Sequence, residues 1–150
     1  MQGNQYINNK KCCNNDITYH GPTPFAVNIS QAARQNCTYR TALWTGCHLQ
    51  MTLMCIPPCG DIGLEVHPDN DQYIRIEEGK CIVKIGCSID RPEMQQELCL
   101  NDAVFIPAGT WHNIINIGSC PLKLSTIYAP PHHPRETIHI TKQDAEKSNC

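Results

Sequence analysis

The stretch from Gly63 to Gly79 limits the possible folds of this chain more than any other, because its polar side chains recur at set spacings. Glu65 and His67 stand two residues apart, so on an extended strand both side chains leave the same face. Gln72 follows after a Pro-Asp-Asn-Asp turn, and Gly79 separates two β-rich runs as in a tight hairpin. The pattern predicts polar groups carried on short strands.

A second stretch, residues 107–116, reads Pro-Ala-Gly-Thr-Trp-His-Asn-Ile-Ile-Asn and places His112 at the start of a strand. Together the two stretches offer two imidazoles, one carboxylate and one amide oxygen. This donor set is typical of a metal site that leaves room for water or substrate.

The first stretch resembles the first motif of the cupin superfamily, His-x-His-x4-Glu-x6-Gly. Glu65 stands at the first His, His67 at the second, Gln72 at the Glu and Gly79 at the closing Gly.

The second stretch resembles the second cupin motif, Gly-x5-Pro-x-Gly-x2-His-x3-Asn. Pro107, Gly109, His112 and Asn116 match it. Asn101 replaces the leading Gly, and Asn also reaches positive φ at a turn. The resemblance covers roughly residues 40 to 130.

The resemblance implies an all-β fold, the double-stranded β-helix or small jelly-roll barrel, holding one divalent transition metal ion. The implied ligands are Glu65, His67, Gln72 and His112. The usual set is three His and one Glu; here the single carboxylate moves to the first position and Gln72 becomes a weak neutral donor. Two His and one Glu suit zinc, iron, manganese or nickel, without a choice among them.

Short β segments with Gly and Pro punctuation predict strands at 39–45, 49–56, 63–67, 72–78, 80–86, 95–100, 103–106, 112–116 and 122–128. Helical pieces are expected at 29–35 and 141–148. The predicted organisation is a polar tail over residues 1–20 and one domain over 21–150, with its barrel core at about 40–130.

Four residues are candidates for substrate binding: Gln50, Thr52, Trp111 and Tyr128. Strand alternation leaves open whether Gln50 and Thr52 line the barrel, or instead Met51 and Leu53. The same alternation predicts that Gln72 points inward and Arg75 outward. His132 and His133, in a proline-rich segment after the last strand, either cover the barrel opening or pack outside it.

The formal charge of −2 and the pI near 6.4 give no footprint for nucleic acid. No apolar segment approaches the roughly 20 residues of a membrane span, so a cytoplasmic location is expected. The 11 cysteines are odd in number and irregularly spaced, which argues against a disulfide framework. Cys81, Cys87, Cys99 and Cys120 are expected to act as small apolar residues of a reduced protein, and a redox role for Cys55 and Cys59 stays open.

The leading hypothesis is a small metal-dependent enzyme that acts on a sugar-like, hydroxy or carbonyl substrate. It would use Lewis-acid and proton-transfer chemistry of the isomerase type, with Glu65 as the catalytic residue. One alternative is a metal-dependent dioxygenase, and another is a non-catalytic module that binds or senses a small ligand. A homodimer is expected, since cupins of this size commonly pair through barrel-edge strands.

Overall fold

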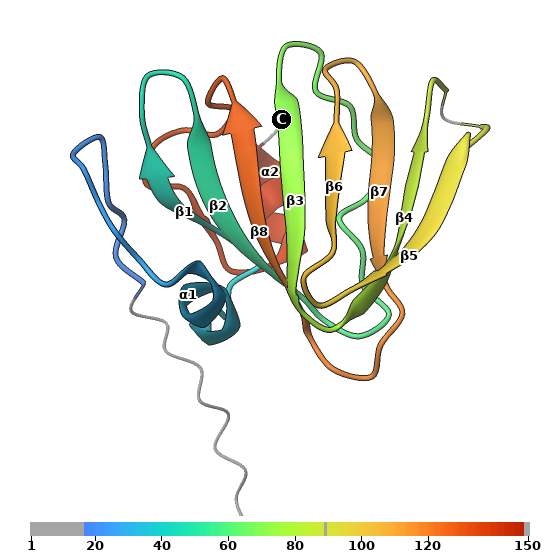
Figure 1. Ribbon diagram of the computed structural model, residues 1–150, viewed down its shortest axis with the longest axis horizontal. Coiled ribbons are helices and arrows are strands. Elements are labelled where there is room, and N and C mark those ends of the chain that lie inside the picture. Colours follow the sequence, from blue (N-terminus) through green and yellow to red (C-terminus); the bar gives the residue numbers. More distant parts are fainter. Residues whose placement is uncertain (1–16, 89, 149–150) are drawn as a thin grey trace, which may run out of the picture.

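The computed structural model describes residues 17–88 and 90–148, and it consists mainly of two antiparallel sheets that face each other (Figure 1). The elements in chain order are α1 (Ile29–Gln35), β1 (Arg40–Thr45), β2 (Gln50–Ile56), β3 (Asp71–Glu78), β4 (Lys80–Gly86), β5 (Met94–Cys99), β6 (Ala103–Ile106), β7 (Trp111–Asn116), β8 (Leu122–Ala129), β9 (Ile138–His139) and α2 (Lys142–Ser148).

The larger sheet has the strand order β6-β3-β8-β2-β1-β9 and the smaller sheet has the order β5-β4-β7. Strand β8 lies between β2 and β3, although both precede it by many residues. Such crossovers between two facing antiparallel sheets make a jelly-roll barrel, which confirms the predicted fold class. The end of the barrel where β2 begins and β8 ends is called the mouth below; the β8 arrow points to it in Figure 1.

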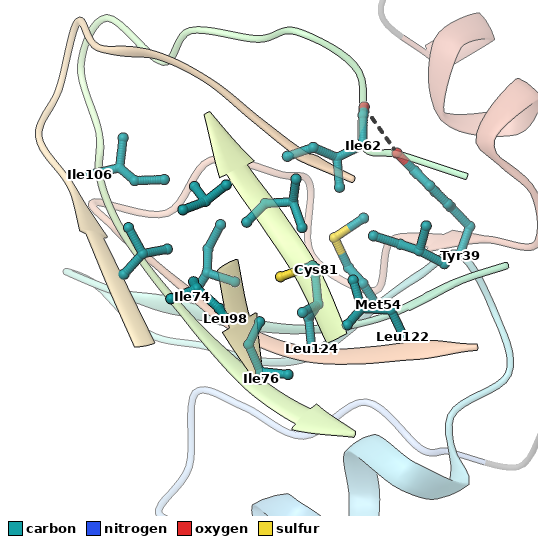
Figure 2. Close-up of a cluster of buried hydrophobic side chains, with 14 of the residues drawn as sticks. Tyr39, Met54, Ile62, Ile74, Ile76, Cys81, Leu98, Ile106, Leu122 and Leu124 are labelled. Carbon is teal, nitrogen blue, oxygen red and sulfur yellow. Dashed lines mark hydrogen bonds between the residues drawn. The ribbon is translucent and has the colours of Figure 1, made fainter. Parts of the chain in front are cut away.

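Strand alternation places the apolar core between the sheets, away from the mouth. Ile74 and Ile76 of β3 and Val83 of β4 are at most 1% exposed, because every second side chain of each strand points inward. Figure 2 shows this cluster, with the Tyr39 hydroxyl donating to the carbonyl of Ile62. The burial of these side chains is the main stabilising contribution to the fold.

Helix α1 covers the outer face of the larger sheet. Its Ala33 packs against Leu43 and Leu53, and Asn28 caps its first turn by accepting from the backbone N–H of Gln31 at 3.0 Å. Ile17 also packs on this cluster. Most of the predicted polar tail, residues 1–16, lies outside the described residues.

Helix α2 begins directly after Thr141, as its sequence predicts. The Thr141 side chain and backbone N–H both bond the Asp144 carboxylate at 2.9 Å. This reciprocal cap satisfies amides that the first turn leaves unpaired.

The predicted strand over residues 63–67 is wrong, because this segment forms no regular strand. Glu65 makes only an isolated bridge to His112. Gly63 has a φ of +85°, outside the β region, and Pro68 has no N–H with which to continue a ladder. The segment therefore runs along the edge of β7 with an interrupted ladder, through isolated antiparallel bridges at Asp61–Ile115 and Glu65–His112.

The cysteine prediction needs correction. Cys81 is buried in the core as expected, but Cys87, Cys99 and Cys120 are exposed. Cys37 is disulfide-bonded, so the protein is not wholly reduced. Among the described residues, no helix is both long and apolar enough to cross a membrane.

Candidate metal site

Backbone hydrogen bonds hold the two sequence motifs together at the mouth. Glu65 and His112 exchange both backbone N–H···O bonds at 3.0 Å, and the carbonyl of His67 accepts from the N–H of Gly109 at 2.8 Å. Gly109 has a φ of +76°, which Gly adopts without steric cost. The tight turn before β7 therefore lies against the segment that carries Glu65 and His67.

This arrangement brings three predicted ligands to one point. The Glu65 Oε1 atom lies 3.3 Å from His67 Nε2 and 3.4 Å from His112 Nε2. One donor atom from each of the three residues lies within 4.8 Å of the others. Side chains from separate segments thus converge inside the barrel.

The donor atoms suit a metal ion. Both Nε2 atoms are buried and have no hydrogen-bond partner within the described part of the chain. The other ring nitrogen of His112, Nδ1, lies 3.0 Å from the Thr110 carbonyl, so it carries the proton and leaves the Nε2 lone pair free. Ligands about 2.0–2.1 Å from a tetrahedral ion would stand about 3.3–3.4 Å apart. The separations from Glu65 to the two histidines match that spacing.

The Glu65 carboxylate is held in its ionised form. Burial acts to raise its pKa, but close contact with the His112 and His67 rings outweighs burial and lowers the pKa well below the usual range. The three residues therefore offer one carboxylate and two imidazole nitrogens to an ion. A divalent ion bound there would leave a net charge of +1.

Gln72 reaches the same interior from β3. It is 4% exposed, it stands opposite Tyr128 of β8, and its Oε1 atom has no hydrogen-bond partner among residues 17–88 and 90–148. Three residues along, Arg75 bonds Glu77 and Asn101 and points away from the site. The predicted alternation along β3 is confirmed.

The interior wall beside the cluster carries two of the predicted substrate-binding residues. Thr52 and Tyr128 are fully buried, and neither hydroxyl has a partner in the described structure. Leu53 follows Thr52 on β2, so it points to the other face of the sheet, where it packs against α1. The question that alternation left open is therefore answered: Gln50 and Thr52 face the barrel interior.

Two other predicted substrate-binding residues are placed differently. The Gln50 side chain accepts from the backbone N–H groups of His132 and His133 and donates to the His133 carbonyl, so its amide is already occupied. Trp111 precedes His112 on β7 and points to the opposite face, where it lines a surface groove of about 240 Å³ with Leu64. Neither residue is retained as a substrate contact.

The loop after β8 covers the mouth, which the sequence left undecided. The ring of His132 lies 4.3 Å from that of His67, and the ring of His133 lies 5.0 Å from that of Tyr128, between centroids. The only sequence feature that points to these histidines is their position directly after the last barrel strand.

Fold and site together define a small jelly-roll barrel protein with a two-histidine, one-carboxylate cluster inside its mouth. A family model described as the cupin domain matches residues 52–128. With this match, and the relatives below, the chain belongs to the cupin family.

Two curated relatives and one solved structure are similar over most of the chain. It is 56% identical over 126 residues to the uncharacterized protein YrkC of Bacillus subtilis (strain 168), covering 84% of this chain and 68% of YrkC. It is 42% identical over 120 residues to the uncharacterized protein L612 of Acanthamoeba polyphaga mimivirus, covering 79% of this chain and 72% of L612. The crystal structure of BH2720 from Bacillus halodurans has a TM-score of 0.86 and 52% identity, covering 87% of this chain and 99% of that one.

Proposed function

We propose that this chain is a metal-dependent enzyme that acts on a small polar substrate by isomerase-type chemistry. Glu65, His67 and His112 hold one divalent transition metal ion, and Gln72 supplies a neutral fourth donor. The observation that carries the proposal is the meeting of the three donor atoms within 4.8 Å. The unpartnered amide oxygen of Gln72 supports the fourth position.

The residues around the cluster fit proton transfer. A bound ion would act as a Lewis acid toward a carbonyl or hydroxyl oxygen of the substrate. Glu65 would have to exchange between ligand and base to accept a proton from a carbon next to that oxygen, and its lowered pKa makes it a weak base. Burial raises the pKa of Tyr128, so its phenol stays protonated at neutral pH and can donate a hydrogen bond.

Elemental analysis of protein purified without added metal tests the ligand set. The wild type is expected to carry a stoichiometric transition metal, and the double variant His67→Ala/His112→Ala is expected to lose it. Gln72→Ala should weaken binding less, because an amide oxygen is a weaker donor than an imidazole. His48→Ala, at an exposed histidine, is the matched control. Stoichiometric metal in the double variant would refute the site.

A second candidate is a metal-dependent dioxygenase. It is favoured by one feature of the cluster: two histidines and one carboxylate form the ligand set of many non-haem iron oxygenases. Iron-loaded protein that consumes oxygen with a candidate substrate would support it. Turnover under strict exclusion of oxygen would instead support the isomerase proposal, and ligand binding without turnover would indicate a binding module.

We also propose a homodimer in the cytoplasm. An exposed aromatic pair on the outer face of the larger sheet supports pairing: Phe105, which is 75% exposed, lies 5.0 Å from Tyr73 between ring centroids. Light scattering of the purified protein measures the mass, and a monomer at micromolar concentration would contradict the proposal.

A further inference from the structure

Arg40 is a buried cation on the inner wall of the barrel. It begins β1 opposite Met54 of β2, whose side chain belongs to the core, so Arg40 shares the inward face. It is only 5% exposed. A buried charge is costly unless another group compensates it.

No carboxylate compensates this charge within the described structure. None of the ion pairs of residues 17–88 and 90–148 includes Arg40, and its Nε atom has no hydrogen-bond partner there. Glu65 is engaged by His67 and His112, as described above. The contacts that remain are with two tyrosines: the guanidinium carbon lies 5.4 Å from the centroid of Tyr39. The guanidinium also lies beside the Tyr128 hydroxyl, and it acts to lower the pKa of that group against the effect of burial. A cation–π contact offsets only part of the cost of burial.

Hydroxyl groups on the same interior wall are also unpaired. Thr52 and Thr126 stand opposite each other on β2 and β8, and Tyr128 follows two residues later. None of their three hydroxyls has a partner among the described residues. Tyr128 also lies 5.5 Å from His67 between ring centroids, so it connects this wall to the candidate metal site.

The side chain of Arg40 extends toward the mouth. On the same face of β1 the next residue is Ala42, whose small side chain stands opposite Thr52. After burial, the charge of Arg40 is the largest influence that lowers the pKa of His133, in the loop that covers the mouth. The guanidinium also lies beside the hydroxyl of Tyr128, whose ring neighbours that of His67, so it faces the same space as the metal ligands.

We propose that Arg40 binds a carboxylate group of the substrate, with the hydroxyls of Tyr128, Thr52 and Thr126 as further donors. This inference rests on the proposed function and narrows its substrate to a small 2-hydroxy or 2-keto acid, whose second oxygen reaches the metal cluster. A planar guanidinium pairs with a carboxylate through two parallel hydrogen bonds. A phosphate ester would call for additional basic residues; Arg135, also in the loop after β8, is exposed.

Titration of the full-length protein with glycolate and with pyruvate tests the inference. Hydroxyacetone and ethylene glycol are the neutral counterparts, and inorganic phosphate is the competing anion. In metal-free protein the two acids should shift the NMR signal of the Arg40 Nε–H group, and calorimetry should show their binding. The neutral compounds and phosphate should do neither. Preference for phosphate, or equal binding of neutral and acidic compounds, would overturn the inference.

Variants separate this inference from the metal proposal. Arg40→Met should weaken acid binding by about tenfold or more, the usual loss when a charged hydrogen bond is removed, and its metal content should match the wild type. Arg135→Met is the matched control and should bind the acids normally. Unchanged acid binding in Arg40→Met refutes the anion site alone. If the purified wild type carries no metal, the metal proposal alone is refuted. The acid titration is unaffected by that result, because it uses metal-free protein. If Arg40→Met fails to fold, the wild-type Nε–H titration still decides.

Discussion

The two ends of the barrel interior are built by the same strands, yet they treat polar atoms in opposite ways. Along β8 the inward residues run from Leu122 and Leu124, both fully buried in the apolar core, to Thr126 and Tyr128, whose hydroxyls are unpaired in the described structure. The change from apolar to polar side chains occurs between Leu124 and Thr126, which are successive inward residues of β8.

The difference shows which end of the barrel interior lowers the stability of the fold. A buried polar atom without a partner costs roughly 1–3 kcal/mol, and several such atoms gather at the mouth while the opposite end has a continuous apolar cluster. The apolar end therefore holds the barrel closed, and the polar end keeps donors and acceptors available for a ligand.

The largest effect is expected from a matched pair of substitutions on β8. Leu124→Ala should lower the free energy of unfolding by about 2–5 kcal/mol, since it leaves a cavity in a packed core. Thr126→Val, two residues closer to the mouth, should change it by about 1 kcal/mol or less, or raise it, because the hydroxyl it removes has no partner. Urea unfolding of metal-free protein measures both. A large loss in Thr126→Val would mean that its hydroxyl is satisfied within the fold.

An intermediate effect is expected at Gln50. Gln50→Leu leaves the N–H groups of His132 and His133 without their acceptor and should cost about 1–3 kcal/mol. Hydrogen exchange should quicken in the loop at 130–134 that covers the mouth. Gln95→Leu, at an exposed position of β5, is the control. Unchanged exchange at 130–134 would show that other contacts hold the loop.

The smallest effect is expected from acid. Burial, followed by the charge of Arg40, lowers the pKa of His133 to about 2, whereas in the unfolded chain it is about 6.5. Below pH 6.5 the unfolded state therefore binds more protons, so the contribution of His133 to stability is full above that pH and declines as the pH falls. Thermal unfolding at pH 7 and pH 5 should show a smaller decrease for His133→Asn than for the wild type. An identical decrease would contradict the assignment.

Much of the candidate site could be predicted, because its ligands lie in two short motifs that resemble those of the cupin superfamily. Glu65 and His67 are two residues apart, and His112 follows a Pro-x-Gly turn, so local geometry was informative. The direction of the Trp111 side chain was predictable too, because a residue next to His112 on a strand faces the other way.

Other parts of the mouth depend on contacts between residues far apart in the chain. The side chain of Gln50 meets backbone groups more than 80 residues later, and no local pattern identifies such partners. Likewise, nothing near Arg40 indicates that it is buried beside Tyr128 without a carboxylate. Only the strand order, which places β2 between β1 and β8, brings these side chains to one wall.

By itself the sequence determined the all-β class and the alternation of inward and outward residues, since these follow from a period of two along each strand. The metal-ligand candidates came from the resemblance of its two motifs to those of the cupin superfamily. The tertiary structure alone decided that residues 63–67 are not a regular strand, that the loop after β8 covers the mouth and that Arg40 lies buried on its inner wall. These features arise from pairings across crossovers, and the geometry of one strand does not specify its distant neighbour.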